Sequence, residues 1–136
     1  LDPDDLWWRP HELANSVGNL LLHLEGNIRQ WILCGLGGEP DTRARSAEFR
    51  ARDSRTAPEL LDALGATIEA AADIVAALDP DSLGDPYEMQ GIPGTVLGAI
   101  YHVVEHLSWH TGQIVWIAKE RGGAGHGIAF YDDSKL

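Results

Sequence analysis

The stretch that decides the fold is TVLGAIYHVVEHLSWHTGQIVWIAKER, residues 95–121. Its apolar side chains recur at helical spacing, Thr95 can cap a helix, and the pair Gly122 and Gly123 can end one. We therefore predict one helix over this whole stretch, about 40 Å long at the usual rise per residue. A helix this amphipathic needs partners for its apolar side, so the rest of the chain must supply them.

Two further stretches show helical periodicity, over about residues 16–36 and about residues 58–78. The connections between the helices are rich in Gly, Pro and charged residues. We expect a polar loop over residues 39–55 with at most a short helical turn near 44–49, and a long connection with at most a short extended piece over 79–93. Neither an internal repeat nor strand alternation is visible. The predicted fold class is therefore all-α, with a helix bundle as its most natural architecture.

Length and charge exclude several classes of protein. A chain of 136 residues with 44% hydrophobic and 23% charged residues is typical of one folded domain, here residues 1–136. The net charge of −11 makes nucleic acids and anionic membrane surfaces poor partners. Cys34, the single cysteine, cannot form an internal disulfide, and neither a signal peptide nor an apolar run of membrane-spanning length is visible. We therefore expect a cytoplasmic protein.

Six histidines in so short a chain suggest a metal site. On a helical wheel with His102 at zero, the apolar stripe of the quoted stretch lies at about 100–160°, His110 at about 80° and His106 at about 40°. His106 and His110 therefore share one helix face and point toward the bundle interior. His23 lies in the middle of the first long helix, at the polar edge of its apolar face, and is the natural third ligand. Three neutral imidazoles suit Zn²⁺, Ni²⁺ or Fe²⁺, and three ordinary half-exposed histidines are the alternative interpretation.

Other polar side chains lie near these histidines on the helical wheels. Asn27 and Gln113 are the closest neutral hydrogen-bonding groups. They can orient an imidazole or a substrate, and a purely structural polar seam explains them equally well. Cys34 lies about three turns from His23, which is too far for a thiolate ligand of the same ion.

The three predicted helices leave part of their apolar surface without a partner. Four apolar side chains of the last helix lie outside its main stripe: Tyr101, Val104, Val115 and Trp116. A further helix or a partner subunit should cover them. The last eleven residues form a tail with three residues that can dock against the bundle: Ile128, Phe130 and Tyr131.

Two stretches of the chain resemble the DinB-like superfamily, which includes the YfiT-like metalloenzymes. They are NSVGNLLLHLEGNIRQWI, residues 15–32, and GIPGTVLGAIYHVVEHLSWHTGQIVWI, residues 91–117. The resemblance covers about residues 3–131, and its most specific parts are HLEGN around His23 and an HxxxH pair followed by TGQ, where many members have RGQ. It implies an up-down-down-up four-helix bundle that is often a homodimer.

The resemblance also implies a metal site. Members hold one divalent ion through a histidine of the second helix and an HxxxH pair of the fourth, which correspond to His23, His106 and His110. His102 would then form a wall of the pocket or contact a ligand. Members usually have a helix before the LWWRP segment, residues 6–10, and this sequence begins almost on that segment. We therefore expect the N-terminal helix to be missing or truncated in this chain.

For function, the resemblance implies a metal-dependent enzyme. Several relatives are thiol-dependent transferases or isomerases, in which the metal activates the sulfur of a low-molecular-weight thiol. We accordingly predict an S-transferase that acts on a small molecule, with Arg29 or the arginines of residues 43–55 receiving the carboxylates of the thiol. The alternatives are a metal-dependent hydrolase with the same ligands and a non-catalytic, stress-associated metal-binding protein.

Overall fold

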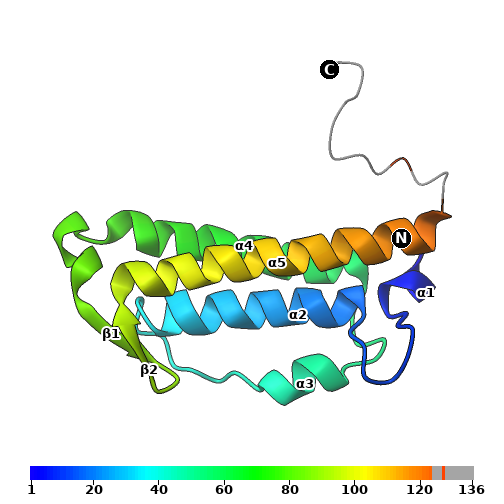
Figure 1. The fold of residues 1–136 in the computed structure, drawn as a ribbon, viewed down its shortest axis with the longest axis horizontal. Coiled ribbons are helices and arrows are strands. Elements are labelled where there is room, and N and C mark those ends of the chain that lie inside the picture. The colour runs from blue at the N-terminus through cyan, green and yellow to red at the C-terminus, as the bar shows by residue number, and fades with distance from the viewer. Residues whose placement is uncertain (124–126, 128–136) are drawn as a thin grey trace.

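The chain folds into helices joined by short connections, with one small hairpin (Figure 1). The computed structural model describes residues 1–123 and 127; the tail residues Ile128, Phe130 and Tyr131, for which docking is predicted, lie outside the described residues. In chain order the elements are α1 (Pro3–Leu6), α2 (Val17–Ile28), the π-helix η1 (Arg29–Cys34), α3 (Arg45–Arg50), α4 (Ala57–Ala77), the 3₁₀ helix η2 (Pro80–Gly84), β1 (Pro86–Met89), β2 (Ile92–Thr95) and α5 (Val96–Gly122). The prediction of an all-α fold is confirmed.

The long helices begin where the sequence offers capping side chains. Ser16 caps α2 and Thr56 caps α4, each in a reciprocal capping box with the residue three positions on. Thr95 caps α5 by accepting a hydrogen bond from the backbone N–H of Gly98. The predicted helices over 58–78 and 95–121 are thus confirmed to within one residue at each end, and the short helical turn near 44–49 is α3.

The helix predicted over residues 16–36 changes its winding partway along. From Arg29 to Cys34 the backbone is a π-helix, and the backbone N–H of Gly35 bonds to the carbonyl of Gln30, five residues back, at 3.1 Å. The wider turn lets three consecutive apolar side chains face inward, since Trp31, Ile32 and Leu33 are all buried. Helical periodicity predicts burial at every third or fourth residue, so it could not reveal this change.

The connection before α5 contains a two-stranded hairpin, where the sequence indicated at most a short extended piece. Strands β1 and β2 pair antiparallel with Met89 opposite Ile92. Gln90 and Gly91 between them both have positive φ, 56° and 76°, as the twist of a tight two-residue hairpin requires. In β1 the half-buried Tyr87 and Met89 alternate with exposed residues, and in β2 Thr95 alone is half-buried, so four residues are too few for an alternation to mark either strand in the sequence.

Helix α2 is the central element of the fold (Figure 1). It lies between α3 on one side and α4 and α5 on the other, and α2 and α4 run in the same direction while α5 runs opposite. The core is built from apolar side chains of α2 and η1 packed on those of α4 and α5: Leu20, Leu24, Ile28, Ile32, Leu60, Leu64, Ala71, Ala99, Val103 and Ile117. This packing holds α2 against α5 along the faces that carry the predicted histidines.

Part of α4 and α5 remains uncovered, as the sequence predicts for Tyr101, Val104 and Trp116, whereas Val115 is half-buried. The exposed apolar residues are Leu61 and Ile68 of α4 and Leu97, Tyr101, Val104, Trp109 and Trp116 of α5. Among the described residues α1 is only a four-residue turn, and no element packs over Tyr101, which is 66% exposed. Within the same residues, no helix is both long enough and apolar enough to cross a bilayer.

Candidate metal centre

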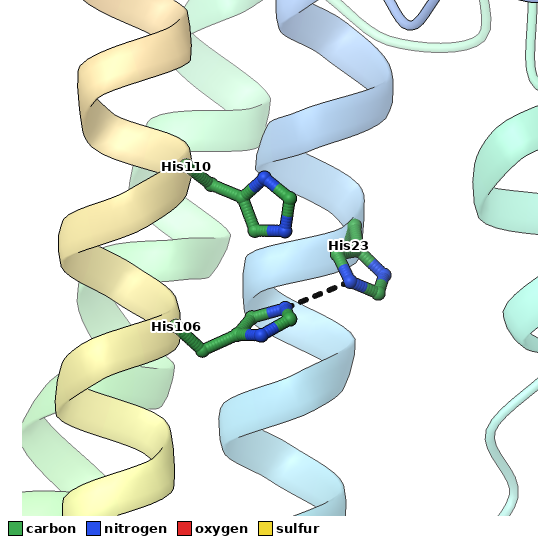
Figure 2. Close-up of side chains that lie close together, drawn as sticks. All are labelled: His23, His106 and His110. Carbon is green, nitrogen blue, oxygen red and sulfur yellow. Dashed lines mark hydrogen bonds between the residues drawn. The ribbon is translucent and has the colours of Figure 1, made fainter.

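Three histidines from two helices converge beside the core (Figure 2). His23 comes from the middle of α2, and His106 and His110 come from consecutive turns of α5. One ring nitrogen from each can be chosen so that all three lie within 4.8 Å of one another, and the Nε2 atoms of His23 and His106 are 2.9 Å apart. The predicted convergence of these three side chains is confirmed, and we call them the histidine triad.

The environment of His106 and His110 favours their neutral form. His23 is 3% exposed, and the other two rings are half-buried. Burial, together with the neighbouring histidines, lowers the pKa of His106 to about 4, and burial likewise lowers the pKa of His110. A neutral imidazole keeps a nitrogen lone pair, which is what a divalent cation needs.

Glu48 orients His23. Its Oε2 lies 2.8 Å from Nδ1 of His23, and since a carboxylate can only accept, we assign the proton to Nδ1. Burial alone would raise the pKa of Glu48, but hydrogen bonds from His23 and Arg43 outweigh it and hold the pKa below its ordinary value. The carboxylate therefore fixes the tautomer in which Nε2 of His23 carries its lone pair toward the other two histidines.

Arg43 completes this arrangement from the far side of the carboxylate. Its guanidinium donates from Nε to Oε1 of Glu48 at 2.7 Å and from Nη2 to Oε2 at 2.9 Å, and a third bond goes to Gln30 at 2.9 Å. The two charged side chains are only 6% and 11% exposed. A bidentate pair with this little access to water holds the carboxylate in one position.

The placement of Glu48 follows from two residues of α2. The side-chain amide of Asn19, fully buried, donates to the backbone carbonyls of Glu48 and Ala51 at 2.8 and 3.0 Å and so ties α3 to α2. Gly26, one turn beyond His23, leaves the space into which Glu48 and Arg43 fit. This close approach gives the glycine of the HLEGN motif a physical reason.

Replacing Gly26 with alanine is expected to weaken metal binding and stability, although no ligand is changed. The added Cβ would collide with Oε1 of Glu48 and come within 3.0 Å of Nε of Arg43. The buried ion pair would then have to move away from His23. The measurements are metal affinity by chelator competition and unfolding in urea.

Gly65→Ala is the matched control for this change. Gly65 also lies inside a helix, α4, but a Cβ there meets nothing within 4 Å. This variant should gain roughly 0.5–1 kcal/mol of stability from its better helix propensity and bind metal normally. If Gly26→Ala behaved in the same way, the proposed close approach would be wrong.

A second polar contact orients His110. Its Nδ1 lies 2.6 Å from Oε1 of Gln113, so Nδ1 carries the proton and Nε2 is left with its lone pair. Gln113, which the sequence analysis placed near the histidines, thus contacts His110 directly. His102 also lies beside the triad: its ring stacks on Trp31 at 4.1 Å between centroids and is 5.3 Å from His106. Asn27 contacts His102, with Nδ2 and Nε2 3.5 Å apart, rather than a ring of the triad.

Acid is expected to destabilise the metal-free protein between about pH 6.5 and pH 4. Over this range the unfolded chain protonates at the usual pKa of 6.5 while folded His106, with a pKa of about 4, stays neutral. The unfolded state binds more protons, so the free energy of unfolding falls as pH falls. Urea midpoints of the metal-free protein across this range measure the effect, and His106→Gln should flatten the dependence. A midpoint that does not change would contradict this assignment.

The donor set fits a divalent ion with an open coordination position. Within the described residues, the triad is the single group of three or more His, Cys, Asp or Glu side chains arranged to hold an ion, and no fourth such ligand joins it. Three imidazoles without a fourth protein ligand are typical of catalytic zinc sites, whereas structural sites have four.

Two aromatic rings lie beside the triad. The centroid of the Phe49 ring is 4.7 Å from that of His23, and the centroid of the Trp109 ring is 6.3 Å from that of His110.

The sequence analysis missed Glu48 and the ion pair that Arg43 makes with it. Both lie in the polar segment between α2 and α4, whose sequence has no periodicity that assigns either side chain to a face. The one signal in the sequence is Gly26 in the interior of an otherwise good helix, because such a glycine often marks a close approach. Arg29, the other predicted receiver of carboxylates, is paired with Glu39 at 2.7 Å.

The fold and site together define an all-α protein with a histidine triad between two of its helices. A family model described as "Protein of unknown function (DUF1572)" matches residues 1–125. The chain therefore belongs to the DUF1572 family. No curated protein matches it.

Proposed function

We propose that this chain is a divalent-metal-dependent enzyme of the DinB-like superfamily, with one Zn²⁺, Ni²⁺ or Fe²⁺ ion held by His23, His106 and His110. The observation that carries the proposal is the histidine triad itself, with ligand atoms within 4.8 Å of one another. The orientation of two rings adds support, because Glu48 and Gln113 each accept a hydrogen bond from an Nδ1 and so leave the lone pair on the Nε2 of that ring.

The proposed reaction is transfer of the sulfur of a small thiol to an electrophilic substrate. A bound divalent ion would supply Lewis acidity, which lowers the pKa of a thiol so that the thiolate is available at neutral pH. The sulfur forms a bond to an electrophilic carbon, the leaving group departs with its electron pair, and the thiol proton goes to solvent. The chain contributes imidazoles whose orientation is fixed by Glu48 and Gln113, and the ring of Phe49 covers His23 at 4.7 Å between centroids.

An open site favours an enzyme over a purely structural metal site. Three protein ligands leave a fourth coordination position for water or a substrate thiolate, and two of the three ligands are half-buried rather than fully buried. A metal-dependent hydrolase would use the same three residues and differ in its substrate. The hypothesis of a thiol substrate also agrees with the cytoplasm as the proposed compartment, because thiols stay reduced there.

We also propose that the exposed apolar face of α4 and α5 is covered in the functional protein, as in a four-helix bundle that forms a homodimer. Leu61 of α4 and Leu97, Tyr101 and Val104 of α5 are each more than half exposed. Helices α2, α4 and α5 run down, down and up in the sense that a DinB-like bundle would require of its last three helices. Sedimentation equilibrium tests the dimer: a mass of one chain at micromolar concentration would contradict it.

A thermal-shift experiment tests the proposed function. Purified protein is stripped of metal, reloaded separately with Zn²⁺, Ni²⁺ and Fe²⁺, and melted with and without a panel of low-molecular-weight thiols. One of the ions should raise the melting temperature, and thiols should raise it further only in the metal-loaded protein, because a ligand stabilises the state that it binds. Equal thiol shifts with and without metal would contradict thiol activation, and the absence of any metal shift would contradict the metal site.

A further inference from the structure

The arginines near the triad differ in whether a ligand can reach them. Arg43 is the closest, with Nη2 3.0 Å from Nδ1 of His23, but its guanidinium is engaged by Glu48 and Gln30 and its side chain is 6% exposed. It is therefore part of the support of the site and is not available to a substrate. An anionic ligand needs a different cation.

Arg45 is such a cation. It is exposed, and within the described part of the chain it makes no ion pair. Its guanidinium carbon lies 5.2 Å from the centroid of the Phe49 ring, one helical turn further along α3. The same Phe49 ring lies 4.7 Å from the ring of His23. Phe49 thus contacts both the exposed guanidinium of Arg45 and the ring of His23.

We infer that Arg45 determines specificity by binding a carboxylate of the thiol that uses the metal centre. This inference rests on the proposed function and selects, from the arginines of residues 43–55, the one that binds the carboxylate. A thiol with its sulfur at the triad has to span the ring of Phe49, which lies 4.7 Å from His23 and 5.2 Å from the guanidinium carbon of Arg45.

The contact with Phe49 leaves the N–H groups of Arg45 available to a carboxylate and restricts its side chain. A guanidinium over an aromatic ring uses its face, and its N–H groups, which lie in its plane, remain free to bind a carboxylate with two parallel hydrogen bonds. The ring also limits the conformations of a long side chain, so less entropy is lost when the ligand binds.

The negative net charge of the chain makes a local cation such as Arg45 important for binding an anionic ligand. The chain carries a net charge of −11, so its long-range field opposes the approach of anions. An anionic substrate therefore needs a local positive charge at the site. The nearest carboxylate of the site, Glu48, does not neutralise Arg45, because it is engaged by His23 and Arg43.

Spectroscopic titration of the cobalt-loaded protein tests this inference. Co²⁺ replaces the native ion, and a thiolate that binds it produces a charge-transfer absorption, so affinity is measured without turnover. The probes are glutathione and its dimethyl ester, which share the thiol but differ in the charge of their carboxyl groups. The proteins are the wild type, Arg45→Gln, Arg45→Lys, and Arg50→Gln as the matched control from the other end of α3.

The expected pattern is specific to the carboxylates. Arg45→Gln should weaken glutathione binding about tenfold, the size of one lost charge-assisted contact, and leave the ester unchanged. Arg45→Lys should restore part of the loss, and Arg50→Gln should bind both probes like the wild type. Equal losses for both probes, no loss, or the same loss in Arg50→Gln would overturn the role of Arg45. A protein that binds no Co²⁺, or whose spectrum neither thiol changes, would instead contradict the proposed function.

Discussion

His106→Ala is expected to remove the bound metal ion from the protein. The substitution deletes one of three nitrogen ligands, and Nε2 of His106 lies 2.9 Å from Nε2 of His23. Two remaining imidazoles cannot hold a divalent ion tightly at protein concentrations in the micromolar range. The wild type should contain close to one ion per chain after dialysis, and the variant close to none, by elemental analysis.

His102→Ala is the control for this experiment. His102 lies one turn before His106 on the same helix and is also half-buried, but it stacks on Trp31 and does not belong to the triad. The variant should retain its metal. If His102→Ala lost the ion and His106→Ala kept it, His102 would be the metal ligand in place of His106, and our proposed ligand set would be wrong. If neither variant lost it, the triad would not be the metal site.

Glu48→Gln is expected to weaken metal affinity by about 10–100-fold, the usual effect of removing the carboxylate behind a ligating histidine. A neutral amide accepts a weaker hydrogen bond from Nδ1 of His23, and it can also turn its N–H group toward the ring and select the wrong tautomer. The substitution additionally leaves the guanidinium of Arg43 buried without its counter-ion, which should cost about 3 kcal/mol of stability. Chelator competition and urea unfolding measure the two effects.

Glu39→Gln provides a matched comparison for Glu48→Gln. Both carboxylates lie 2.7 Å from an arginine, but the side chains of the Arg29–Glu39 pair are 46% and 44% exposed, against 6% and 11% for Arg43–Glu48. Glu39→Gln should therefore change stability by less than about 1 kcal/mol and leave metal affinity unaltered. Equal effects of the two substitutions would show that burial of the Glu48 pair has no role in the site.

The long helices and the triad were predictable because their signals are local. A capping side chain acts on N–H groups within the next turn, and an HxxxH pair places two rings on one helix face whatever the rest of the chain does. The same reasoning selected His106 and His110 over His102. The π-helix after Ile28 and the hairpin around Gln90 were not predictable in this way, because each depends on packing against elements distant in the sequence.

Sequence patterns alone predicted the three long helices and three histidines able to converge, since helical geometry relates positions only a few residues apart. How those histidines are held depends on contacts between segments distant in the sequence. Arg43 and Glu48 contact His23 although they lie about twenty residues further along the chain. The contact depends on Asn19, which is hydrogen-bonded to the segment of Glu48, and on the space beside Gly26, which has no side chain. No periodicity encodes such a contact, because it exists only once α3 packs on α2 and water is excluded from the charges between them.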